Sequence, residues 1–135
     1  MAPKPPTVVE LEWTERLAFA AKLSKSSMVI DSGGDAPSPV ELLATALAGC
    51  MSVDLAYILT RGRHSYTALR SRLEAERAPD EPHRFTAVRL HFVLTGNVPP
   101  EAVERAVQLS REKYCSVWHS MRQDIDLQVT FELTP

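Results

Sequence analysis

The sequence predicts a single α+β domain with elements in the order βββ-α-ββ-α-(α)-β. Three observations support this class: short alternating runs near both ends, a long apolar helical stretch in the middle, and a second helix after two long strands. No segment pattern indicates a parallel βαβ unit. A chain of 135 residues is long enough for one core and too short for two ordinary domains, so residues 1–135 are expected to form one domain.

The N-terminal part contains three short β-like runs joined by tight connections, followed by a loop. The paired glycines and the prolines of SGGDAPSP, residues 32–39, are typical of a loop. Neither GxxxxGK[ST] nor GxGxxG is present, so this loop is not expected to bind phosphate. The three predicted strands are residues 7–13 (TVVELEW), 17–23 (LAFAAKL) and 27–31 (SMVID).

A long helix is expected to follow this loop. Ser38 can serve as the N-cap, Pro39 occupies the first helical position, and Glu41 stands where a capping box requires an acid. The helical pattern continues to Arg61, and Gly62 is expected to stop it. Such a helix is about 34 Å long.

Between residues 42 and 53 this helix is apolar or small on every side (LLATALAGCMSV), which predicts a central helix buried all round. A subunit of this size covers such a helix poorly, so a second copy of the chain is expected to cover the rest of it in a homodimer. The charge-free run is about 12 residues, whereas a membrane-spanning helix needs roughly 20. We therefore expect a core helix and no membrane partner.

The C-terminal part alternates strands and helices. The expected elements are a strand over 66–78, a strand over 85–95, a helix from Pro100 to Tyr114, a short helix opened by Cys115, and a strand over 126–133. In the second strand, the apolar residues Val88, Leu90, Phe92 and Leu94 share one face.

The composition excludes several classes of function. Apolar residues make up 44%, charged residues 24%, and the net charge of −2 with a pI near 6.1 gives no basic surface for nucleic acid. The N-terminal residues show no apolar core of a secretory signal. Two cysteines are too few for a disulfide scaffold, so a reducing, cytoplasmic location is expected.

The two cysteines leave two interpretations open. Cys50 lies in the middle of the apolar helix and Cys115 lies at a helix junction 65 residues later. Both can be inert, buried hydrophobic residues, or both can be reactive thiols. No CxxC and no histidine at metal spacing is present, so neither a zinc site nor a cofactor is expected.

Two motifs around these cysteines point to a known family. APSPVELLATALAGC and LSREKYCSV, together with RLHFVLTG and EAVERAV, resemble the OsmC and organic-hydroperoxide-resistance family, closest to its less characterised OsmC-like branch. The resemblance implies an OsmC-like fold on an intertwined homodimer. It also implies a thiol peroxidase in which Cys50 is oxidised by an organic hydroperoxide to a sulfenic acid. Cys115 then forms a disulfide with it, and a lipoyl or thioredoxin-type dithiol reduces the pair.

The chain departs from the family pattern near the first thiol. The family's peroxidases place a glutamate ten residues before the first cysteine, where this chain has Val40. Glu41 lies nine residues before Cys50, on the opposite face of the helix, and has a structural role as the capping-box acid. Glu41 can therefore support a thiolate only through the dimer partner.

Three further residues are candidates for supporting the thiols. Arg16, the only arginine before Cys50, and Lys113, two residues before Cys115, can supply the cation that a thiolate needs. His119 follows Cys115 by one helical turn and can act as a base or tune that thiol.

Two alternatives to a peroxidase remain. The first is an OsmC-fold protein for small-molecule binding or stress response, with weak or no peroxidase activity and an apolar ligand held between helices. The second is a structural dimer with inert cysteines, which would make both cysteine motifs accidental.

Overall fold

The computed structural model describes residues 2–135 and confirms the predicted α+β class. The chain divides into two compact units, one up to Leu43 and one from Ala44 to Pro135. The division falls inside helix α1 (Pro39–Arg61), which begins in the first unit and continues through the second. The predicted single domain covers both units and stays a prediction.

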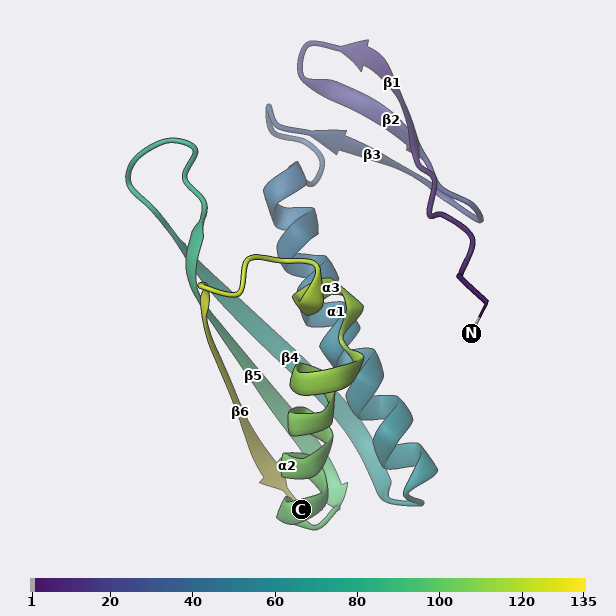
Figure 1. Cartoon of the computed structure of the whole chain (residues 1–135), viewed down its shortest axis with the longest axis vertical. Coiled ribbons are helices and arrows are strands. Elements are labelled where there is room, and N and C mark those ends of the chain that lie inside the picture. Colours follow the sequence, from purple (N-terminus) through teal and green to yellow (C-terminus); the bar gives the residue numbers. More distant parts are fainter. Residues whose placement is uncertain (1) are drawn as a thin grey trace. The chain divides into compact units, whose positions relative to one another are not determined.

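The N-terminal unit is an antiparallel sheet with the strand order β1-β2-β3 (Figure 1). Its strands are β1 (Glu10–Glu15), β2 (Ala18–Lys22) and β3 (Ser27–Asp31). β1 begins three residues later than predicted, because Glu10 already pairs with Lys22 at the end of β2. The chain then turns, with the Leu23 N–H donating to the Ser26 carbonyl, so residues 7–9 have no paired position opposite them.

Helix α1 begins with the predicted capping box. The Glu41 N–H donates to Ser38 Oγ at 3.1 Å, and the Ser38 N–H donates to Glu41 Oε1 at 3.1 Å. Two N–H groups that lack partners within the helix are thereby satisfied. The structural role predicted for Glu41 is confirmed.

The end of α1 differs in one detail from the prediction. Gly62 closes the helix, but Arg63 adopts the left-handed backbone, with φ of 59°. The Arg63 N–H donates to the Thr60 carbonyl and the His64 N–H to the Leu59 carbonyl, which is the Schellman arrangement. A Cβ at Gly62 would lie 2.9 Å from Cδ2 of His64, so a larger residue there would displace the His64 ring.

Replacing Arg63 with glycine is expected to raise the free energy of unfolding by about 1 kcal/mol, because a side chain at positive φ is strained. The measurement is the urea midpoint of the variant and the wild type at equal protein concentration. As a matched control, Gly62→Ala is expected to lower that midpoint. A fall in stability for Arg63→Gly would show that the arginine side chain contributes more than its backbone costs.

Within one chain, α1 is buried along one stripe only, so a single subunit covers this helix poorly, as expected, and its burial on every side stays a prediction that requires a second copy. Leu47, Met51, Leu55 and Leu59 are buried, one turn apart. On the opposite face, the side chains of Val53 and Tyr57 are 65% and 63% exposed. By length and hydropathy alone α1 could also cross a membrane. Its buried stripe instead fits the core helix of a folded domain.

The C-terminal unit is built on a second sheet with the order β4-β5-β6, and α1 and α2 lie on the same face of it (Figure 1). β4 (Ser65–Arg77) and β5 (Phe85–Asn97) are antiparallel, whereas β5 and β6 (Asp126–Thr134) are parallel. The expectation of no parallel unit is therefore wrong. Residue alternation reports which face a side chain occupies and not the direction of the strand, so it could not reveal this pairing.

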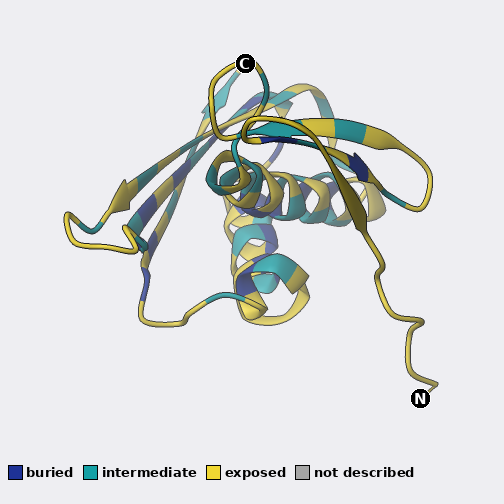
Figure 2. Ribbon diagram, turned by 90° about the horizontal axis from the view of Figure 1, so that it is seen from above, coloured by how far each residue is buried: buried dark blue, intermediate teal, exposed yellow. Residues whose placement is uncertain are grey.

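The core of this unit lies between the sheet and its helices. Val88, Leu90, Phe92 and Leu94 of β5 are fully buried, as the alternation predicts. Figure 2 shows buried segments, in dark blue, along strands of the sheet and on the helices that cover it. The outer face is polar, with Arg89 Nη1 at 2.6 Å from Glu76 Oε2. The sheet thus provides a rigid support for the helices that carry the two cysteines.

Candidate functional site

The structure brings Cys50 and Cys115 together in the C-terminal unit, and places Asp54 with them. Cys50 and Asp54 lie one turn apart on α1, and Cys115 comes from the segment after α2. The two sulfurs and a carboxylate oxygen of Asp54 all lie within 4.8 Å of one another. Both cysteines are free thiols, Cys50 half-buried and Cys115 fully buried.

Cys115 is positioned by a break in the helical path. The helix predicted to reach Tyr114 is α-helical only over α2 (Pro100–Leu109) and continues as the π-helix η1 (Ser110–Tyr114). The Cys115 N–H donates to the Ser110 carbonyl at 2.8 Å. The backbone is then extended at Cys115 before α3 (Ser116–His119) begins, which confirms the predicted junction. π-Helical turns often occur at functional sites.

The surroundings of Cys115 hold it in the protonated form. The pKa of the Cys115 thiol is raised to about 11, mainly by burial and in smaller part by the neighbouring Cys50 thiol and the Asp54 carboxylate. The Trp118 N–H donates to Cys115 Sγ at 3.3 Å and acts in the opposite direction. Among residues 2–135, no lysine or arginine contributes to this shift.

The raised pKa of Cys115 predicts a pH dependence of stability. The unfolded thiol loses its proton near pH 9 and the folded one only near pH 11, so above pH 9 the unfolded state binds fewer protons. This contribution to stability is complete below pH 9 and is lost as the pH rises through 11. Ultraviolet thiolate absorbance of the reduced protein, with Cys115→Ser subtracted, should show a step near 11. A step at or below 9 would contradict the prediction.

Asp54 and Ser110 are the residues that sequence reasoning missed. Ser110 is fully buried, and its Oγ donates to Asp54 Oδ2 at 2.7 Å. This bond ties α1 to the beginning of η1, on the two segments that carry the cysteines. One signal was available: an acid placed four residues after a cysteine, within a predominantly apolar helix, lies on the same face as that cysteine.

A hollow beside the site connects Asp54 to solvent. It has a volume of about 540 Å³, and besides Asp54 it is lined by Tyr57, Ile58, Arg61, Leu109 and Tyr114. Most of this lining is apolar or aromatic, with the guanidinium of Arg61 two turns along α1 from Asp54. Such a lining suits an apolar molecule with a polar end, and Asp54 is the residue that the hollow shares with the dithiol site.

The supporting residues predicted beside Cys115 lie on the surface. Lys113 is exposed, and its ammonium lies 5.3 Å from the centre of the Tyr114 ring. His119 is exposed, and its Nε2 lies 3.0 Å from the Arg111 carbonyl oxygen, to which it can donate. Neither residue contributes to the raised pKa of Cys115. Their supporting roles stay predictions.

The other two predicted supporting residues belong to the N-terminal unit. Arg16 lies in the β1–β2 turn, as expected, with φ of 45°, and its carbonyl accepts a hydrogen bond from Trp13 Nε1. Glu41 takes part in the capping box. A role for either at the thiols stays a prediction.

The same three donor atoms form a set that a metal ion could use. Two sulfurs and a carboxylate oxygen suit Zn²⁺, and three protein ligands would leave one position open. Local spacing does not indicate this set, because its members come from segments that are far apart in the sequence. The experiments on this site therefore include a chelator control.

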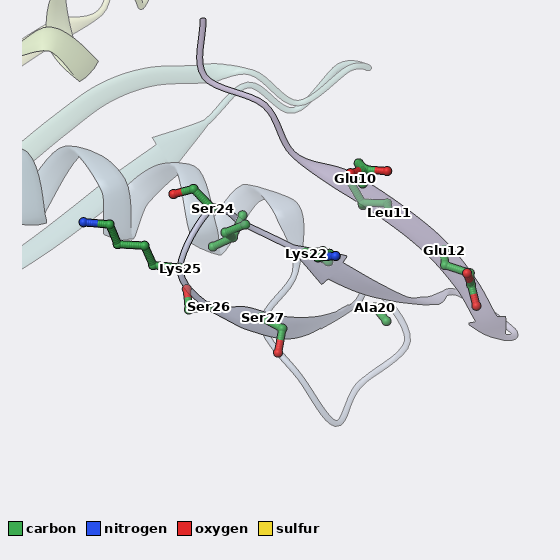
Figure 3. Close-up of a pocket in the computed structure, with 11 residues that line it drawn as sticks. Glu10, Leu11, Glu12, Ala20, Lys22, Ser24, Lys25, Ser26 and Ser27 are labelled. Carbon is green, nitrogen blue, oxygen red and sulfur yellow. The ribbon is translucent and has the colours of Figure 1, made fainter. Parts of the chain in front are cut away.

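A second hollow, of about 680 Å³, lies on the N-terminal sheet around the β2–β3 turn (Figure 3). Its lining carries both charges, with Glu10 and Glu12 on β1 and with Lys22 and Lys25 at the end of β2 and in the turn that follows. The turn and the start of β3 also contribute Ser24, Ser26 and Ser27. No cysteine lies among its described lining residues. It therefore offers no thiol chemistry.

The fold and the site together define a class: an α+β protein in which a long apolar helix and a π-helical junction bring two free thiols together. A model of the family described as OsmC-like protein matches residues 32–130. The chain belongs to the OsmC-like protein family.

Individual relatives agree with this assignment. Protein YhfA of Escherichia coli strain K12 is 35% identical over 127 residues, covering 91% of this chain and 95% of the relative. A hypothetical protein from Aquifex aeolicus VF5 superposes with a TM-score of 0.90 at 29% identity, over 97% of this chain and 98% of that one. An organic hydroperoxide resistance protein OsmC from Legionella pneumophila has a TM-score of 0.73 at 17% identity, over 97% and 99%, and so shows the shared fold.

Proposed function

We propose that the protein is a thiol-dependent peroxidase that reduces organic hydroperoxides through a Cys50 sulfenic acid and a Cys50–Cys115 disulfide. The observation that carries the proposal is the approach of two free sulfurs to within 4.8 Å of each other. Membership of the OsmC-like family supports it, as does the fold shared with a protein named for organic hydroperoxide resistance.

The unequal surroundings of the two thiols favour Cys50 as the one that attacks. Cys50 is half-buried and can be reached by substrate, whereas Cys115 is fully buried with a raised pKa. Only a thiolate attacks a peroxide efficiently, so Cys115 is better suited to the second step.

The reaction proceeds in two balanced steps. The Cys50 thiolate attacks one peroxide oxygen, the O–O bond breaks, and the departing alkoxide takes a proton to give the alcohol. The Cys50 sulfenic acid then reacts with the Cys115 thiol, which forms the disulfide and releases water. A lipoyl or thioredoxin-type dithiol supplies the two electrons that restore both thiols.

A cation is still required to hold Cys50 as a thiolate. Arg16 and Lys113 are the proposed sources, and in a homodimer Glu41 of one copy would support the thiol of the other. His119 is kept as a proposed supporting residue for Cys115, although it does not contribute to the raised pKa of that thiol. The reducing cytoplasm is the proposed location, because it keeps both thiols available.

The test is consumption of cumene hydroperoxide by the reduced protein, with dihydrolipoamide or thioredoxin supplied as reductant. The proposal predicts turnover that saturates with the dithiol and is faster with cumene hydroperoxide than with hydrogen peroxide. Failure of both dithiols to sustain turnover, together with no loss of peroxide in a single turnover, would refute it.

A second function is favoured by the hollow beside Asp54. The lining of this hollow is partly aromatic, and no cation is among the groups that shift the pKa of Cys115. Both features suit a protein that holds a small apolar ligand and has weak peroxidase activity. Stoichiometric loss of cumene hydroperoxide with loss of two thiols would exclude this alternative.

The same helix supports a homodimer. Val53 and Tyr57 form part of an apolar face opposite the buried stripe of α1, together with the exposed small residues Ala46 and Gly49. A second copy of the chain would remove this face from water. The two sites would then flank a shared contact, since Cys50 lies at the edge of that face.

Light scattering after size-exclusion chromatography should give twice the 15.0 kDa chain mass for the wild type. Val53→Asp is expected to shift the protein to the mass of one chain, because a buried carboxylate in this contact is costly. The exposed Gln108→Ala on α2 serves as a control and should remain dimeric. A wild type with the mass of one chain, or one that binds lipid vesicles through this face, would contradict the homodimer.

A further inference from the structure

We propose that Asp54 is a catalytic residue that carries the proton between Cys115 and the leaving hydroxide when the disulfide forms. The inference rests on the proposed peroxidase function. It assigns the proton transfer of the second step to Asp54, which is not among the site residues predicted from the sequence. It stands on geometry, because one oxygen of Asp54 lies within 4.8 Å of both sulfurs.

The carboxylate is held in place for this task. Ser110 Oγ donates to Oδ2 of Asp54 at 2.7 Å, which fixes the side chain and leaves its other lone pairs available. Since Ser110 is fully buried and also accepts the Cys115 N–H through its carbonyl, one residue positions both partners of the proton transfer. The hollow beside Asp54 gives the released water a path to solvent.

The second step needs such a group for two reasons. Cys115 must lose its proton to attack, yet its high pKa means that almost none of it is ionised near neutral pH. The hydroxide that leaves Cys50 is a poor leaving group unless it is protonated. A base that takes the first proton and returns it to the oxygen meets both needs.

The proton and electron balance is complete. The Cys115 S–H proton passes to the Asp54 carboxylate as the sulfur electron pair attacks the Cys50 sulfur. The S–O bond of the sulfenic acid breaks, and the departing hydroxide takes the proton from Asp54. The products are the Cys50–Cys115 disulfide and one water, and Asp54 is again a carboxylate.

Asp54→Asn distinguishes this role from a purely electrostatic one, because the two predict opposite signs. The negative charge of Asp54 raises the pKa of Cys115, so its removal alone would make more thiolate and accelerate disulfide formation. Loss of a proton carrier would instead slow disulfide formation by about 100-fold. Asparagine keeps the size of the side chain and an oxygen that can accept from Ser110.

The experiment follows both steps after mixing the reduced protein with one equivalent of cumene hydroperoxide. Sulfenic acid formation is measured by dimedone trapping in a Cys115→Ser background, and disulfide formation by the mass change of quenched samples. With Asp54→Asn, the first rate should stay within about threefold of the parent while the second falls about 100-fold, and Asp54→Glu should restore part of it.

The pH profile gives an independent readout. Around Cys115, the titratable groups that shift its pKa are Cys50 and Asp54 on α1, and the Trp118 N–H acts from α3. Disulfide formation in Asp54→Asn should therefore accelerate with pH as Cys115 ionises, whereas the wild-type rate should change little near neutral pH. Equal pH profiles in the two proteins would overturn the proposal.

The remaining outcomes distinguish a failure of the proposed peroxidase function from a failure of the role of Asp54. Wild-type protein that does not consume the hydroperoxide refutes the proposed function itself. A wild type that forms the disulfide while Asp54→Asn forms it equally fast or faster refutes only the role of Asp54. Slowing of the wild type by a chelator would show that a bound metal ion, in place of proton transfer, explains the need for the carboxylate, and would also overturn the proposal.

Discussion

Replacing Cys50 with serine is expected to lower the rate of organic hydroperoxide consumption by on the order of 10³-fold or more, because the attacking nucleophile is lost. A serine hydroxyl is not ionised near neutral pH and does not attack the O–O bond. Cys50 is the residue proposed to meet the substrate, because it is half-buried beside a fully buried partner thiol. Consumption is measured under saturating dithiol with cumene hydroperoxide.

The Cys115→Ser variant is the matched control for that experiment. It should still consume one equivalent of hydroperoxide at close to the wild-type rate, since Cys50 is intact. It should then stop turning over or become over-oxidised, because the sulfenic acid has no partner thiol. Full activity of Cys50→Ser would contradict the role of Cys50 as the attacking thiol. Loss of the first turnover in Cys115→Ser would indicate that Cys115 attacks the hydroperoxide instead.

The largest expected effect on stability comes from Leu55→Ala. Leu55 is fully buried on α1, in the same stripe as Leu47, Met51 and Leu59. Deleting a buried leucine side chain removes its transfer free energy and leaves a cavity, at a cost of about 2–5 kcal/mol. Because domains are stable by only about 5–15 kcal/mol, this change should lower the urea midpoint sharply.

The comparison is made at fixed protein concentration, since subunit association contributes to apparent stability. Gln108→Ala on the exposed side of α2 should change the free energy of unfolding by less than about 0.5 kcal/mol. A cost below about 1 kcal/mol for Leu55→Ala would mean that the stripe is not the core of the C-terminal unit.

Local signals in the sequence predicted most elements of the fold. Ser38 and Glu41 form their capping box, and the buried face of β5 is the one that its alternation indicated. The parallel pairing of β6 depends on how a crossover packs, and alternation carries no information about it. The left-handed residue at the end of α1 is Arg63 and not the glycine, because the hydrogen bonds that close this helix place Arg63 at the left-handed position.

The candidate site was predicted only in part, because some of its contacts join segments that are far apart in the sequence. The family resemblance of the two motifs paired Cys50 with Cys115, and the structure places their sulfurs close together. Asp54 and Ser110 join the site through a bond between α1 and η1, and such a contact between distant segments leaves no local pattern. Lys113 and His119 are near Cys115 in sequence, yet the π-helix and the break at Cys115 leave both on the surface.

The most direct test of the paired thiols is a thiol count on denatured protein before and after one equivalent of cumene hydroperoxide. The reduced chain has two free cysteines, and after oxidation none should remain. The intact mass should fall by two hydrogens, and a dithiol should restore both thiols. Two thiols remaining after exposure, or oxygen added to Cys50 with Cys115 still free, would contradict the account.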